Sequence, residues 1–288
     1  MKPSTLLLSR TIRNSLIFLA IFLITLGAIF IPYMKYINAS LSPSISRLMM
    51  DITSFIPSVI AGWMMIKYID KETRKATKAD THTLLIETIT GLLIGLSWIT
   101  LSYCLQFAFG TIKINESANS LQFDFLIYAT ALLINAASQE FLFRGYLFRL
   151  IQHNHGFLSA LFTTSLLFMF IHAGALAAGI IPSLNVFGAG VIFGLTVKST
   201  GRIWTAIAIH FSWNFLYSSV LYKPIAGYQG LHLYNTTGSE LLAGGQNGVE
   251  ATIITSVTIV VIVALQRYYL KLLLAETHEE YERNCLDN

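Results

Sequence analysis

Long apolar stretches separated by short polar segments make up most of the chain. Residues 15–33 contain no charged side chain, and this stretch is long enough to cross a bilayer and longer than the apolar core of a secretory signal. Similar stretches follow at about residues 45–68, 84–109, 123–150, 157–181, 185–197, 203–221 and 249–274. The pattern predicts an all-α polytopic membrane protein with about eight transmembrane helices, of which the short, glycine-rich sixth is the weakest.

Composition agrees with this interpretation. Hydrophobic residues are 54% of the 288-residue chain and charged residues 12%, whereas charged residues make up about a quarter of an ordinary globular domain. The net charge of +4 comes from basic residues in short segments beside the apolar stretches, where they set orientation. We therefore expect a lipid bilayer as a partner and no nucleic acid.

The basic residues alternate between segments. They gather at the N-terminus and around residues 67–78, 144–155 and 198–202, and the segments 34–44, 110–122, 182–184 and 223–248 hold at most one lysine each. The positive-inside rule then predicts an integral membrane protein, which we expect in a bacterial cell membrane, with both termini cytoplasmic. The segment 223–248 is interpreted as an outer loop that is either a flexible connection or a lid.

No linker or repeat divides the chain, so we expect one structural domain. Within it, residues 1–120 carry the first three helices, and residues 121–222 carry core helices four to seven. Residues 223–288 carry the outer loop, the last helix and an acidic cytoplasmic tail.

Polar side chains deep in the predicted spans are candidates for function, because they are costly in hydrocarbon. Glu140 and Arg144 lie four residues apart, and His210 and Asn214 have the same spacing, which places each pair on one helix face. His172 belongs to a third span. At about 1.5 Å of rise per residue, these side chains fall within one slab of the membrane.

Each group also has a structural interpretation. Glu140 and Arg144 could form an ion pair that locks helices together, while a histidine or an asparagine in an apolar helix can serve packing alone. Together, however, a carboxylate, two imidazoles and an amide match the requirements of water-activated hydrolysis: a base, a proton shuttle and oxyanion donors.

The order Glu-x-x-x-Arg, Phe-x-x-x-His, His-x-x-x-Asn, with the run 143–147, resembles the CPBP family of intramembrane proteases. This family includes the CAAX prenyl endopeptidases and the bacterial Abi proteins associated with bacteriocin immunity. The likeness covers about residues 135–216. It implies catalytic roles for Glu140, His172, His210 and Asn214, in which His172 partners the base while His210 and Asn214 stabilise the oxyanion, with Gln139, Arg144 and Phe168 in support.

The chain departs from the family pattern at Gln139, where the family has its first glutamate. A glutamine cannot accept a proton, so Glu140, about 100° around the helix, must activate the water or catalysis is lost. Two hypotheses remain open. One is a glutamate-type intramembrane endopeptidase that cuts a membrane protein or a lipidated, for example prenylated, peptide. The other is an inactive member that acts as a membrane scaffold or bacteriocin-immunity factor.

Further alternatives are a transporter or channel, and a zinc enzyme with Glu140, His172 and His210 as ligands. No His-Glu-x-x-His pattern supports zinc and no inverted repeat supports transport. We therefore expect a hydrolase without a cofactor.

Overall fold

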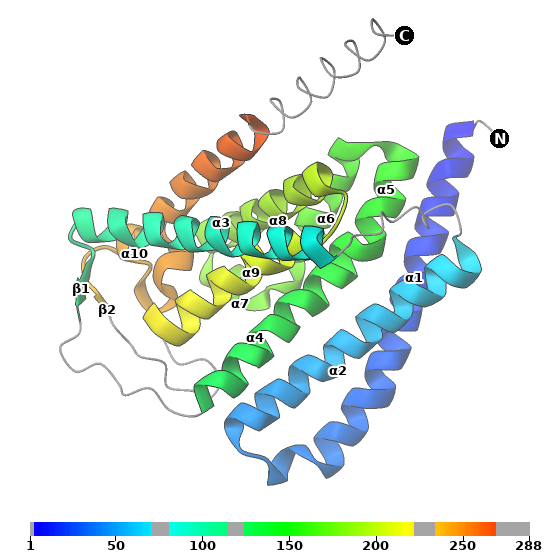
Figure 1. Cartoon of the computed structure of the whole chain (residues 1–288), viewed down its shortest axis with the longest axis horizontal. Coiled ribbons are helices and arrows are strands. Elements are labelled where there is room, and N and C mark those ends of the chain that lie inside the picture. Colours follow the sequence, from blue (N-terminus) through cyan, green and yellow to red (C-terminus); the bar gives the residue numbers. More distant parts are fainter. Residues whose placement is uncertain (1–2, 71–80, 115–123, 222–233, 269–288) are drawn as a thin grey trace, which may run out of the picture.

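The chain folds into a bundle of helices (Figure 1). The computed structural model describes residues 3–70, 81–114, 124–221 and 234–268. Five described helices are long and apolar enough to cross a membrane, and two shorter apolar helices accompany them. The protein is thus an all-α polytopic membrane protein, as predicted; the count of eight spans stays a prediction.

The N-terminal half contains three long helices. Helix α1 (Pro3–Tyr36) and a 3₁₀ turn η1 (Asn38–Ser40) lead to α2 (Pro43–Met64), which continues into the π-helical segment η2 (Met65–Ile69). Helix α3 (Thr81–Ala108) is followed by the short strand β1 (Ile112–Ile114). The predicted second and third spans agree closely with these helices, and the predicted first span, 15–33, lies inside the longer α1.

The second half begins with a helix of three parts, α4 (Asp124–Glu140), the π-helical η4 (Phe141–Leu147) and α5 (Phe148–His155). It continues with α6 (Phe157–Ile171), α7 (Ala173–Ala178), α8 (Ile180–Thr200), α9 (Trp204–Phe215) and the π-helical η5 (Leu216–Leu221). Strand β2 (Tyr234–Thr236), helix α10 (Glu240–Ala243) and the 3₁₀ segment η6 (Gly245–Ala251) precede the helix Ile253–Tyr268.

The prediction of one continuous helix over residues 157–181 is correct for residues 157–171 and wrong beyond them. Helix α6 ends at Ile171, and Gly179 separates α7 from α8 with φ +120°, a conformation that glycine adopts readily and other residues rarely. The predicted loop 182–184 lies inside α8, because Pro182 occupies the first turn, where a missing N–H costs nothing. The sixth span is therefore longer than the predicted 185–197.

The last two predicted spans also need small changes. The range 203–221 is an α-helix only to Phe215 and a π-helix beyond it. The helix expected over 249–274 begins at Ile253, because residues up to Ala251 form η6. Residues 269–274 and the acidic tail lie outside the described residues.

One end of the bundle joins the helix termini that adjoin the basic segments. Helix α1 contacts the end of η2 through Arg10–Asp70 and contacts α5 through Thr11–His155. Helix α5 contacts the end of α8 through Arg149–Gly201, and the start of α9 is linked to α3 through Arg202–Glu87. This agrees with the alternation in the sequence. That this end faces the cytoplasm stays a prediction.

The opposite end carries a two-stranded antiparallel sheet. Strand β1 pairs with β2, with Lys113 opposite Asn235, so the segments that follow α3 and precede the last helix meet at this end (Figure 1). The part of the predicted outer loop from residue 234 onward therefore has secondary structure. Its first part, residues 223–233, lies outside the described residues.

Helix α3 lies against α9 at two glycines. A Cβ atom added at Gly91 would come 2.6 Å from the Cβ of Ala208, and one at Gly95 would come 2.7 Å from the Cβ of Ser212. The small-xxx-small spacing allows this close approach of two backbones. It fixes α9, which carries His210 and Asn214.

Candidate active site

A cavity of about 300 Å³ lies between the helices, at the lower end of the range for small-molecule sites, roughly 300–1,000 Å³. Aromatic residues form much of its wall, and its polar lining comes from α2, α4, the α6–α7 junction, α8, α9, η5, η6 and the helix that follows η6. The polar lining residues are Arg47, Asn135, Gln139, His172, Asn185, His210, Asn214, Tyr217, Ser218, Glu250 and Thr255.

Gln139 and Glu140 face different surroundings. Gln139 lines the cavity, whereas Glu140 is not among the lining residues and has no exposed surface. Adjacent residues on a helix point about 100° apart, so one of the two has to turn away. The structure turns the carboxylate into the protein and the amide toward the cavity.

The buried carboxylate of Glu140 contacts two basic side chains. Its Oε1 accepts hydrogen bonds from Nη1 of Arg144 at 3.2 Å and from Nδ1 of His210 at 3.1 Å. The predicted ion pair with Arg144 is therefore present, and it is completely buried. Because the carboxylate accepts from Nδ1, the proton of His210 is held there and Nε2 is left for other partners.

Arg144 also joins α8. Its Nη2 donates to the backbone oxygen of Gly190 at 2.9 Å, and its guanidinium carbon lies 4.7 Å from the ring centroid of Phe168. Gly190 packs closely on Ser165 of α6. Arg144 thus holds the π-helical segment η4 against α6 and α8, and π-helical turns are frequent at functional sites.

His172 is placed by the break after α6. It caps the helix with φ −89° and ψ 67°, and its Nδ1 donates to the backbone oxygen of Phe168 at 2.6 Å. The carbonyl can only accept, so the proton sits on Nδ1 and Nε2 is unprotonated in the neutral ring. Nε2 is thereby available as an acceptor at the cavity.

His210 and Asn214 come from one face of α9, as their spacing predicts, and both line the cavity. The ring of Phe193 stacks on His210 at 4.8 Å with an interplanar angle of 18°. The ring of Phe168 contacts both histidines, with its centroid 4.4 Å from that of His172 and 5.7 Å from that of His210. Phe168 and Phe193 thus restrict the orientation of both imidazoles.

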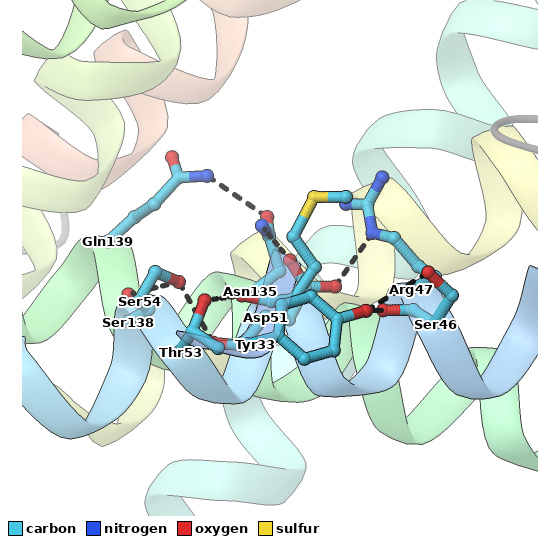
Figure 2. Close-up of polar contacts among 10 residues, drawn as sticks. Tyr33, Ser46, Arg47, Asp51, Thr53, Ser54, Asn135, Ser138 and Gln139 are labelled. Carbon is cyan, nitrogen blue, oxygen red and sulfur yellow. Dashed lines mark hydrogen bonds and ion pairs between the residues drawn. The ribbon is translucent and has the colours of Figure 1, made fainter. Parts of the chain in front are cut away.

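A chain of hydrogen bonds orients Gln139 (Figure 2). Asp51 pairs with Arg47 and accepts from Nδ2 of Asn135 at 2.9 Å, and Oδ1 of Asn135 accepts from Nε2 of Gln139 at 3.0 Å. A carboxylate only accepts, so the polarity of the chain is set by Asp51. Gln139 consequently keeps its Oε1 as a buried acceptor without a partner among the residues that the structure describes.

Sequence reasoning missed Glu250. It lies in η6, just before the helix Ile253–Tyr268, and lines the cavity. Its Oε1 accepts from the indole Nε1 of Trp213 at 2.9 Å. Burial raises the pKa of this carboxyl, and the hydrogen bond from Trp213 partly opposes that shift. The available signal was a single acidic residue at the start of an apolar stretch, whereas the sequence-based candidates were polar residues deep inside the predicted spans.

The ligand set considered for zinc is not assembled. Among the residues that the structure describes, no three His, Cys, Asp or Glu side chains are grouped so as to hold a metal ion. Glu140 and His210 touch, but Glu140 is turned from the cavity that His172 lines.

Comparison with known proteins bears on the same helices. Residues 121–216 match a family model described as type II CAAX prenyl endopeptidase Rce1-like. The match runs from the segment before α4 to the first residue of η5 and so includes the buried ion pair and both histidines. No curated protein matches the chain.

Proposed function

We propose that the protein is an intramembrane endopeptidase, because residues 121–216 match the family model described as type II CAAX prenyl endopeptidase Rce1-like. It hydrolyses a peptide bond in a membrane-associated or prenylated substrate. The observation that carries this proposal is the meeting of His172, His210, Asn214 and Gln139 at one cavity.

The geometry supports a division of roles. His172 offers an unprotonated Nε2 that accepts a hydrogen bond from the attacking water, and Gln139 offers a second acceptor, Oε1. The amide of Asn214 is a donor for the developing oxyanion. His210 donates from Nε2 when both of its ring nitrogens carry a proton, and the Glu140 carboxylate at Nδ1 then balances the charge. Glu140 acts behind His210, because its Oε1 already binds His210 and Arg144; it is a positioning residue in this proposal.

A second candidate function has one observation in its favour. The cavity has an amide at residue 139, and the neighbouring Glu140 is sealed in an ion pair. An inactive scaffold or immunity factor would tolerate this arrangement. Such a protein would retain its protective or binding effect in cells when His172 is changed to alanine.

The deciding experiment is proteolysis in reconstituted vesicles. The wild-type chain is incubated with an internally quenched peptide anchored by a farnesylated cysteine, and with the same peptide fused to a single transmembrane segment. We expect His172→Ala and His210→Ala to lose about 10²–10⁴-fold in turnover. His153→Ala is the matched control, because His153 is an exposed histidine of α5 outside the cavity.

The outcomes separate the two functions. Cleavage by wild type and by the His153 variant, with loss in the two cavity variants, supports the endopeptidase. Equal cleavage by all four proteins, or none by folded wild type on either substrate, contradicts it.

A further inference from the structure

The cavity contains a carboxylate that comes from outside the family-matched segment. Among the described residues that line it, Glu250 is the acidic one, and it lies beyond residue 216, where the match ends. Gln139 cannot take a proton, and Glu140 does not reach the cavity. A carboxylate able to accept a proton from cavity water is therefore supplied by the η6 segment.

Two sets of contacts hold Glu250 in place. Trp213, which donates to its Oε1, packs against Trp98 with ring centroids 4.1 Å apart. The backbone oxygen of Glu250 accepts from Nδ2 of Asn185 at 2.8 Å, and the same amide binds Thr252. The side chain thus sits on a braced segment, which is what a group needs to act on a bound water.

One oxygen of this carboxylate is left for other partners. Oε1 is engaged by the indole, and no described residue donates to Oε2. Gln139 lines the same cavity, and its Oε1 is an acceptor that the hydrogen-bonded chain from Asp51 does not use. A bound water has two O–H bonds, so it can donate one to Oε2 of Glu250 and the other to Nε2 of His172 or Oε1 of Gln139.

We propose that Glu250 is the general base of this cavity, taking a proton from the water that attacks the substrate. The inference rests on the proposed endopeptidase function. As the water oxygen bonds to the carbonyl carbon, its proton moves to Oε2 and the carbonyl becomes an oxyanion beside His210 and Asn214. When the C–N bond breaks, the proton passes from Glu250 to the leaving nitrogen, so one water is consumed and no other reactant is needed.

Electrostatics agrees with this role. A carboxyl whose pKa is raised by burial is a stronger base than an ordinary one. The other charged or titratable side chains that line the cavity are Arg47, His172, His210 and Tyr217.

The test combines substitution with chemical rescue in the full-length protein. Glu250→Gln keeps the shape and an acceptor for Trp213, and we expect its turnover to fall about 10²–10⁴-fold, as for a lost general base, with KM little changed. Glu250→Ala should be equally slow, and sodium formate should raise its turnover several-fold where sodium chloride does not. Glu240→Gln is the control, an exposed glutamate in α10 of the same connection.

The readouts distinguish this inference from the function beneath it. A Glu250→Gln variant as active as wild type, or a Glu250→Ala variant that formate does not stimulate, would overturn the inference and leave the endopeptidase standing. A folded wild-type chain that cleaves neither substrate would overturn both. Loss in the two Glu250 variants, with formate rescue and an unaffected Glu240 variant, supports the assignment.

Discussion

The guanidinium of Arg144 lies 3.2 Å from the carboxylate of Glu140, and neither side chain has any exposed surface. Removing one member of such a pair leaves an uncompensated buried charge. We expect Arg144→Ala to lower the free energy of unfolding by about 3–5 kcal/mol, measured by equilibrium denaturation in detergent micelles.

Arg149→Ala is the matched control for this loss. Arg149 is in the same three-part helix, and its hydrogen bond to the backbone of Gly201 is exposed, where such a contact contributes little. The double change Glu140→Gln and Arg144→Met should recover much of the stability, because no charge remains unpaired. Equal losses for Arg144→Ala and Arg149→Ala would contradict a stabilising role of the buried pair.

The role of Glu140 can be separated from that of a base. Glu140→Gln retains an oxygen that can accept from Nδ1 of His210, so the imidazole should keep its orientation. We expect a fall in turnover smaller than the roughly 10²–10⁴-fold of a lost base, and no change in the acid limb of the pH profile. Turnover is measured across the acid and neutral pH range on protein that elutes as a single folded species.

One result for Glu140→Gln would contradict this positioning role. A loss in Glu140→Gln as large as that in Glu250→Gln, together with a shifted acid limb, would return the water-activating role to Glu140.

The direction in which Glu250 moves the acid limb of the pH profile follows from the raised pKa of its carboxyl. A raised pKa means that the carboxylate is protonated, and activity lost, at a higher pH than for an ordinary glutamate.

Sequence spacing predicted local relationships well. The four-residue interval placed Glu140 beside Arg144, and the same interval placed His210 and Asn214 together at the cavity. Both are consequences of helix geometry, which depends on neighbours in sequence. The prediction of a bundle likewise followed from the length of the apolar stretches.

Relationships set by tertiary packing were not accessible in this way. Which of Gln139 and Glu140 faces the cavity depends on the rotation of α4, and that rotation is fixed by contacts of Arg144 with α6 and α8. The break at His172 lies within a continuous apolar run, where hydropathy gives no signal. Glu250 reaches the site from a segment remote in sequence, through a contact with Trp213.

The glycines at the α3–α9 contact give a prediction about the site's scaffold. At Gly95 an added Cβ would lie 2.8 Å from the backbone oxygen of Ile209, so Gly95→Ala has to push α9 outward. We expect a loss of about 1–3 kcal/mol, as in other overpacked contacts, and a drop in turnover because His210 moves. Gly62→Ala is the control, since nothing lies within 4 Å of its added Cβ; a drop in both variants would contradict the argument.

The orientation of the cavity follows from the same bundle. The cavity residue Tyr217 donates to the backbone oxygen of Asn247 in η6, a segment that follows strand β2 and helix α10 in the chain and is separate from the basic segments. If the basic end is cytoplasmic, as the positive-inside rule predicts, the cavity lies nearer the outer surface.

In a background with Cys104→Ser and Cys285→Ser, Asn247→Cys should react with a membrane-impermeant maleimide added to intact cells, because Asn247 is exposed and the substitution keeps its backbone oxygen. His153→Cys, exposed at the other end of the bundle, should react only after permeabilisation, and the reverse labelling would place the cavity toward the cytoplasm.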